Sequence, residues 1–224
     1  MTFLQLINKV LRGLRESQAT TITDTEYVTM IGQLINEAKE DIEDLGPWRA
    51  LRTVVSPSTV AGQTTDHTLT GTNERSYLFY LPSLEGPMPM AFITSAGYER
   101  RLQVIPQDHL VSLQRLYPNA DQACPQYVSI AKSTGLTARF WPTPDAIYTT
   151  AFDIIIPQAE LAAAATVLTI PARPVWQEAL VRAMEERGEE FAGPLDSARA
   201  RAARSIESAM LSDFGVEPLT FTAE

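Results

Sequence analysis

Helical patterns occupy both ends of this 224-residue chain, and a long strand-like region separates them. Apolar residues recur at three- and four-residue spacing over residues 3–14 and 27–45, and again after residue 174. An amphipathic helix must bury its apolar stripe against another element. The most economical fold packs the terminal helices against one another, so that the middle of the chain becomes an insertion in a helical bundle.

Capping signals indicate where the first two helices begin and end. Thr2 stands three residues before Gln5, and Thr23 stands three residues before Glu26, which is the spacing of a capping box. In that motif the hydroxyl accepts a backbone N–H of the first turn, while the longer side chain reaches back. Gly46-Pro47 predicts the end of the second helix, because glycine permits a left-handed cap and proline cannot continue the ladder.

Two more helices are expected toward the C-terminal end. Pro171 and Pro174 flank the start of the third helix, and Gly193-Pro194 predicts a sharp break after it. The fourth helix is expected from about Leu195 to Ser212, with a packing face made mostly of alanine. Small side chains let two helix backbones approach closely, so this helix should pack tightly against a neighbour.

The region between the helical ends has the pattern of a β-rich domain. Short apolar runs alternate with glycine, proline, asparagine and threonine, which predicts strands joined by turns. The expected strands are Leu51–Val55, Thr68–Thr70, Tyr77–Leu81, Ala91–Thr94, Arg101–Val104, Tyr127–Ala131, Ala138–Trp141 and Tyr148–Ile155. A leucine at every third position after Pro106 predicts one short helix. Ala162–Ala165 favours a helix, whereas Thr166–Ile170 favours a strand.

These patterns together predict an α+β protein. Residues 1–47 and 173–215 supply about four helices of one bundle, and residues 48–172 form a β-rich insertion with one short helix. Residues 216–224 are left as an extended C-terminal tail. Leu34 lies in the middle of the second apolar stripe, so truncating it should be costly if the bundle buries it.

The sequence argues against a secreted or membrane-spanning protein. Cys124 is the only cysteine, so no intrachain disulfide can form. No apolar run approaches the roughly 18 to 20 residues that a membrane-spanning helix needs. Lys9, Arg12 and Arg15 recur at helical spacing within the first residues, unlike the apolar core of a signal peptide. We therefore expect a soluble protein of a reducing compartment, with no membrane association.

The charge balance argues against a protein that grips nucleic acid. The chain has 18 basic and 27 acidic residues, for a net charge of −9, and each of the four predicted segments is net negative. Affinity for nucleic acid depends on a cluster of basic side chains that replaces the counterions of the phosphates. An acidic protein can still lie beside DNA without binding it.

Residues for catalysis or metal binding are sparse. His67 and His109 are the only histidines, and they stand in separate segments without a metal-ligand spacing. Cys124 is a formal candidate for a nucleophile with His109 as its base, but a small residue in a loop is the far simpler interpretation. No phosphate-binding or dinucleotide-binding glycine motif occurs. We predict no catalytic residue, no metal site and no cofactor.

Two further clusters have simpler explanations than a ligand site. The acidic residues of the second helix share a solvated face, since metal ligands usually come from more than one element. They are Glu37, Glu40, Asp41, Glu43 and Asp44. The aromatic residues of the β region alternate along strands and favour core or interface packing over stacking on a sugar or base. They are Tyr77, Phe79, Tyr80, Phe140 and Trp141.

Several phrases of the sequence resemble the neck proteins of tailed bacteriophages. The clearest is ARFWPTPDAIYTTAF at residues 138–152, where a strand ends in a Pro-x-Pro-Asp turn and the next strand returns. The lead-in LTIPARP at 168–174, the opening FLQLINKVLR at 3–12 and the helix end at 46–48 are also similar. Together with the order of its parts, the whole chain resembles a head-to-tail adaptor, the protein that docks beneath the portal ring.

The resemblance implies a structural role in the virion. Such adaptors form rings, typically dodecamers, beneath the portal protein; they extend the DNA channel and offer a platform to tail or nozzle proteins. The chain would then be made in the host cytoplasm and reside at the portal vertex, where genomic DNA passes through the ring during DNA ejection. The absence of recognisable catalytic chemistry and the acidic balance both suit a channel wall along which DNA slides.

The resemblance also suggests which residues meet the partners. In these adaptors the C-terminal tail reaches the portal, which here assigns portal binding to Val216, Pro218, Leu219 and Phe221. A frayed chain end is the alternative explanation of this segment. The acidic helical face of Glu37, Glu40, Asp41 and Asp44 is the hypothesis for a surface that lines the channel.

Two other functions stay open at this point. One is a neck or tail-completion protein that stacks further from the portal and touches tail proteins instead. The other is a cytoplasmic ligand-binding module whose β domain holds a sugar or peptide with its aromatic side chains. Binding to purified portal, binding to purified tail, and ligand-dependent quenching of Trp141 fluorescence distinguish the three.

Overall fold

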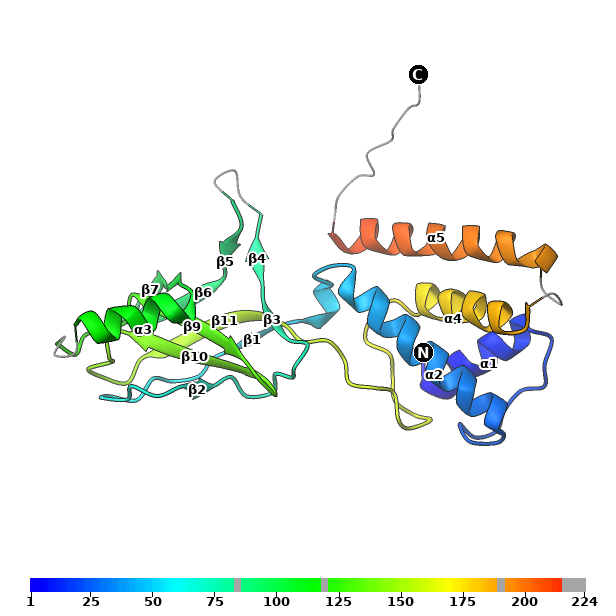
Figure 1. The fold of residues 1–224 in the computed structure, drawn as a ribbon, viewed down its shortest axis with the longest axis horizontal. Helices are drawn as coiled ribbons and strands as arrows, with labels where there is room; N and C mark the ends of the chain where they lie inside the picture. The colour runs from blue at the N-terminus through cyan, green and yellow to red at the C-terminus, as the bar shows by residue number, and fades with distance from the viewer. Residues whose placement is uncertain (83–85, 118–120, 189–191, 215–224) are drawn as a thin grey trace, which may run out of the picture. The chain divides into compact units, whose positions relative to one another are not determined.

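The computed structural model of the chain describes residues 1–82, 86–117, 121–188 and 192–214. It shows an α+β protein whose chain divides into two compact units (Figure 1). One unit, here called the helical unit, comprises Met1–Leu51 with Gln158–Glu224, and the other, the β unit, comprises Arg52–Pro157. No helix in the described ranges is long and apolar enough to cross a bilayer.

The helical unit is built from both ends of the chain. Its elements are α1 (Phe3–Gly13), α2 (Glu26–Asp44), the 3-10 turn η1 (Arg49–Leu51), α4 (Ala172–Glu186) and α5 (Ala192–Phe214). Helix α4 packs against α1, α2 and α5, and Figure 1 shows it between α5 and the two N-terminal helices. The buried apolar residues of α1 and α2 recur at the spacing that the sequence predicted.

The first predicted cap is confirmed and the second is wrong. Thr2 and Gln5 form the capping box of α1, with both reciprocal hydrogen bonds present. At α2 the N-cap is Thr25, whose hydroxyl accepts the N–H of Val28 at 3.1 Å. The chain before it is held by Asp24, whose carboxylate accepts the backbone N–H of Thr20 and Thr21. Residues 20–24 therefore form a turn, and the N-cap of α2 lies at Thr25, two positions after the predicted Thr23.

The end of α2 is closed by a side chain rather than by a left-handed glycine. Gly46 is absent from the positive-φ positions of the chain, and Leu45 caps the helix in a right-handed conformation. The buried indole of Trp48 donates from Nε1 to the carbonyl of Ile42 at 2.7 Å. Leu45, which the sequence placed in the apolar stripe, is 49% exposed.

The prolines and glycines at the C-terminal helices lie differently from the prediction. Gly193 and Pro194 belong to the first turn of α5 rather than to a break before it. Proline is tolerated there because its missing N–H has no partner in a first turn anyway. The left-handed residue after α4 is Gly188, with φ of 63°. The predicted strand over Thr166–Ile170 is reduced to a single bridge between Val167 and Thr2.

The β unit contains two main sheets and a separate two-stranded ribbon. Its strands are β1 (Arg52–Val55), β2 (His67–Thr68), β3 (Tyr77–Leu78), β4 (Tyr80–Leu81), β5 (Met88–Pro89), β6 (Ala91–Ser95), β7 (Tyr98–Arg101), β8 (Gln103–Val104), β9 (Tyr127–Lys132), β10 (Leu136–Trp141) and β11 (Thr149–Ile155). One sheet has the order β1-β11-β6-β7, with β3 also on β11; the other has the order β2-β10-β9-β8, and β4 pairs with β5. Helix α3 (Gln107–Leu116), which the leucine spacing predicted, packs against β9.

Both main sheets supply the core of the β unit. Its buried cluster takes alternate residues of β6, β9, β10 and β11, and the rings of Phe140 and Phe152 lie 6.3 Å apart. Two predicted strands are split. Residues 77–81 form β3 and β4, and residues 101–104 divide between β7 and β8 around the fully buried Leu102. The chain changes from one sheet to the other at that point.

Candidate interaction surfaces

The acidic face of α2 is partly neutralised by one arginine of α4. Arg182 forms an ion pair with Asp41, lies 3.6 Å from the carboxylate of Glu37, and lies 3.5 Å from Glu178. Burial lowers the pKa of Arg182, but the hydrogen bond and charge of Asp41, with the charge of Glu178, raise it above its ordinary value on balance. The face therefore carries less net charge than the run of carboxylates suggests.

The four residues predicted to line the channel differ in how far their side chains are exposed. Glu37, Asp41 and Asp44 are exposed, and Glu40 is half-buried. Glu40, Asp41 and Asp44 stand three, four and seven residues after Glu37, so the four share one side of the helix. Glu37 and Asp41, which stand 61% and 66% exposed, present carboxylates to solvent as well as to Arg182.

Glu43 does not belong to that solvated face, and the sequence interpretation was wrong for it. Glu43 and Lys39 are completely buried and form an ion pair at 3.6 Å. The Lys39 ammonium also donates to the carbonyls of Gln158 at 2.6 Å and Ala159 at 3.1 Å, and Glu43 accepts the N–H of Gln158 at 3.2 Å. A buried charge needs this number of partners to offset its lost hydration.

The buried pair connects α2 to a segment far along the chain. Asn36 extends the contact, since its side chain accepts the N–H of Leu161 at 2.9 Å and donates to the carbonyl of Leu161 at 3.4 Å. Residues 158–161 are thereby held against the side of α2 that carries Asn36, Lys39 and Glu43. The only sequence signal was the i,i+4 spacing of Lys39 and Glu43, which is also typical of solvent-exposed pairs.

The predicted portal-binding residues Val216, Pro218, Leu219 and Phe221 lie outside the described residues. Helix α5 ends just before them, at Phe214. Its last turn is tied to η1, because Asp213 accepts the N–H of Arg49 at 2.6 Å. The C-terminal end of α5, as far as it is described, is thereby attached to η1.

The candidate nucleophile and base do not form a pair in the described parts of the chain. Cys124 is half-buried, and its sulfur accepts a hydrogen bond from Arg100 at 2.7 Å. His109 is exposed on α3. His67 is buried against the ring of Phe140 at 5.2 Å, and burial lowers its pKa. Among the described residues no three histidine, cysteine or acidic side chains are grouped to hold a metal ion.

The aromatic residues divide between the core and the surface. Phe140 is buried in the core, while Trp141 packs against Tyr127 with ring centroids 5.7 Å apart. Tyr77 and Tyr80 are about two-fifths exposed, at 38% and 44%. These aromatic side chains line neither of the two cavities that lie along α4 and α5.

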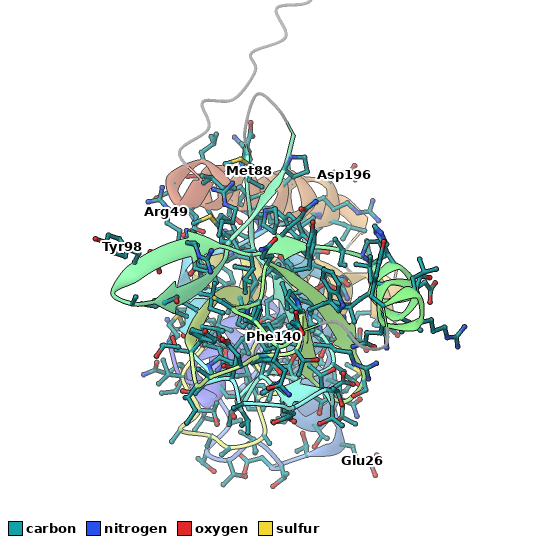
Figure 2. All side chains as sticks on the ribbon, turned by 90° about the vertical axis from the view of Figure 1, so that its left-hand side faces the viewer. Glu26, Arg49, Met88, Tyr98, Phe140 and Asp196 are labelled. Atoms are coloured by element: carbon teal, nitrogen blue, oxygen red, sulfur yellow. The ribbon has the colours of Figure 1, made fainter. Side chains whose placement is uncertain are left out.

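An exposed aromatic residue that the sequence did not single out lies on a hairpin. Tyr98 is 77% exposed where β6 turns into β7, and Figure 2 shows it extending away from that hairpin. The turn places Ala96 and Gly97 at positive φ, of 52° and 80°, as in two-residue hairpin turns. An exposed ring at the tip of a hairpin is available for contact with another protein.

A comparison with known protein families gives a match over most of the chain. The family of the SU10 adaptor protein matches residues 1–216. The match therefore takes in the β unit and helices α1, α2, α4 and α5, and it ends within residues 216–224. No curated protein matches the sequence.

Proposed function

Because the chain belongs to the SU10 adaptor protein family, a family of phage head–tail adaptors, we propose that it forms a ring beneath the portal and joins the head to the tail. The observation that carries this proposal is the family match over residues 1–216, which includes both units. The protein would be a structural component of the virion neck, assembled there after synthesis in the host cytoplasm.

In this proposal the four long helices act as one bundle that carries the β unit as an insertion. Helix α4 supports the assignment because it packs against each of the other three. The ring, a dodecamer that matches the portal, would use a heterologous contact in which one surface of each copy meets a different surface of the next. Exposed side chains on the hairpins of the β unit, such as Tyr98 and Leu81, suit such contacts.

The ring would extend the DNA channel without binding a sequence. We assign Glu37, Glu40, Asp41 and Asp44 to the channel wall, where carboxylates repel phosphates and let the duplex slide. The exposure of Glu37 and Asp41 supports this assignment, and the ion pairs with Arg182 reduce the negative charge that they present. This proposal gives no residue of this surface a catalytic role, and an adaptor of this kind needs no cofactor.

The portal contact is assigned to the tail. Val216, Pro218, Leu219 and Phe221 combine two large apolar side chains with a residue that favours extended backbone. A short segment of this kind can order on a pocketed partner, which supplies the apolar burial that it lacks alone. Tail or nozzle proteins would attach to the opposite end of the ring.

Sedimentation of the full chain with the portal ring of the same genome tests the proposed function. We expect co-migration at about one copy per portal subunit. A chain that stays with purified tail and ignores the portal would instead be a neck or tail-completion protein. Absence of binding to either would overturn the virion assignment.

A chain that ends at Gly215 tests the assignment of the tail separately. The described residues are all retained, so we expect it to fold like the full chain by circular dichroism. We expect it to lose binding to the portal ring, because the two apolar anchors are removed. Equal binding by the shortened chain would remove Val216, Pro218, Leu219 and Phe221 from the contact while leaving the adaptor role intact.

A further inference from the structure

A groove follows the seam between α4 and α5 in the helical unit. One cavity of about 470 Å³ lies between the first turn of α4 and the C-terminal half of α5. A second cavity of about 310 Å³ lies between the middle of α4, the N-terminal half of α5 and Gly13 of α1. Arg201 lines both cavities, so they are neighbouring parts of one depression. We call it the α4–α5 groove, and its characteristic residues are Arg173, Arg201, Arg204, Trp176, Gln177 and Leu180.

The first cavity is positively charged in a protein that is acidic overall. Arg173, Arg201 and Arg204 line it and are exposed. Arg173 and Arg201 form no ion pair with any residue in the described ranges, and Arg204 donates only to the carbonyl of Ala200, at 3.0 Å. The acidic residue on the same wall, Asp213, already accepts the N–H of Arg49. Three guanidinium groups with little compensation favour a negatively charged ligand.

This pattern is specific to one side of α5. Arg199, only two residues from Arg201, is directed to carboxylates: it donates to Glu185 at 2.7 Å and lies 3.6 Å from Asp196. Ser208 and Ser212 also line the first cavity, together with Pro171, Pro174, Ser205 and Ala209. The small hydroxyl side chains of Ser208 and Ser212 leave room for an approaching chain and offer hydrogen bonds to it.

The second cavity has a mainly apolar wall, and the amide oxygen of one lining residue has no hydrogen-bond partner among the described residues. Trp176, Leu180 and Met184 supply its apolar wall. Gln177 also lines it, is only 7% exposed, and its amide oxygen is buried without a hydrogen-bond partner in the described part of the chain. A buried acceptor without a donor costs stability, and a ligand that brings an N–H would recover that cost.

We infer that the α4–α5 groove binds a short peptide segment of a partner protein, with acidic residues against the arginines and an apolar side chain against Trp176 and Leu180. A peptide provides all three requirements: carboxylates for the guanidinium groups, an apolar side chain for the second cavity, and backbone N–H donors for Gln177. The inference does not depend on the proposed role as an adaptor.

Nucleic acid fits the groove less well. Its affinity rises with the number of phosphates that are neutralised, and one cavity with three arginines engages only a few. The net charge of −9 opposes the approach of a strand over longer distances. The apolar second cavity has no match in a phosphate backbone.

Titration of the full chain followed by NMR tests this inference. The probe is a blocked pentapeptide of two leucines followed by three glutamates, at low salt. Its controls are the same peptide with glutamines and a single-stranded thymidine pentanucleotide. We expect the glutamate peptide to shift the arginine Nε–H signals of the groove and the indole signal of Trp176, and to bind about tenfold tighter than either control.

Two matched variants locate the binding site. The double substitution Arg201→Gln and Arg204→Gln changes exposed side chains, so the fold should be kept, and we expect peptide affinity to fall about tenfold or more. Arg199→Gln lies on the same helix but outside the groove, and we expect a change of less than about twofold. Equal weakening by both variants, no binding of the glutamate peptide, or tighter binding of the pentanucleotide would overturn the inference.

Discussion

The two units of the protein differ in the buried contacts that stabilise each of them. The helical unit buries a charged pair, Lys39 and Glu43, and uses it to attach a segment more than 110 residues away through hydrogen bonds to backbone. The β unit is built around an apolar cluster between its sheets. Among the described residues, each unit leaves two buried polar atoms without partners: those of Tyr27 and Gln177 in the helical unit, and those of His67 and Ser129 in the β unit. Directional polar contacts specify which segments meet, whereas apolar burial supplies most of the stability. The helical unit should therefore respond to loss of one charge as well as to loss of apolar volume, whereas the β unit should respond mainly to loss of apolar volume.

Breaking the charged pair should have the largest effect. Lys39→Met removes the ammonium that faces Glu43 inside the helical unit, together with its two hydrogen bonds to the carbonyls of residues 158 and 159. We expect a loss of about 3 to 5 kcal/mol in the unfolding free energy of the helical unit, measured by denaturant titration. Replacing both residues, as Lys39→Met with Glu43→Leu, should recover part of that loss. A single variant as stable as the parent would mean that the pair contributes nothing.

Removing apolar volume tests the other side of the comparison. Ile154 is completely buried in the β unit, and Ile154→Ala should cost about 2 to 5 kcal/mol because it leaves a cavity between packed side chains. The matched control is Val54→Ala on the neighbouring strand β1, where the side chain is 58% exposed. That change should stay within about 0.5 kcal/mol. Similar losses for both variants would show that burial does not control stability in this sheet.

Truncations of Leu34 and Ile35 compare a half-buried and a buried position of the apolar stripe of α2. The structure leaves the side chain of Leu34 half-buried, whereas its neighbour Ile35 is completely buried. Leu34→Ala should therefore cost about 1 to 2 kcal/mol, and Ile35→Ala about 2 to 5 kcal/mol. A larger loss for Leu34 in the isolated chain would contradict this order. Protection of Leu34 only in the assembled ring would identify it as an interface residue.

The buried histidine of the β unit should produce the smallest effect. Burial lowers the pKa of His67 below its ordinary value of 6.5, so the unfolded chain binds the proton more readily. Its contribution to stability is then complete above about pH 6.5 and is lost as the pH falls below that value, by at most about 1.4 kcal/mol per pH unit. Denaturant titrations of the β unit at about pH 7.5 and 5.5 measure the slope. His67→Phe, which keeps a ring beside Phe140, should flatten it; an unchanged slope would assign it to other groups.

Interactions between close neighbours in the chain were readable from the sequence. The capping box of Thr2 and Gln5, the stripes of α1 and α2, the leucine spacing of α3 and the α+β class were predicted because each depends on contacts a few residues apart or on a repeating pattern. The phrases that resemble phage neck proteins likewise lie in the sequence itself, and the family match agrees with them.

Contacts between distant residues were decided only by the tertiary structure. In the sequence, Glu43 has the same spacing as the acidic residues around it, and only the contact with Gln158, more than 110 residues away, distinguishes it. The cap at Thr25 depends on the turn that Asp24 closes before it. The α4–α5 groove requires Arg173 and Arg201 to meet across two helices. A local pattern states which side of a helix is polar, but only the packing of other segments determines whether that side meets water, a backbone carbonyl or a partner.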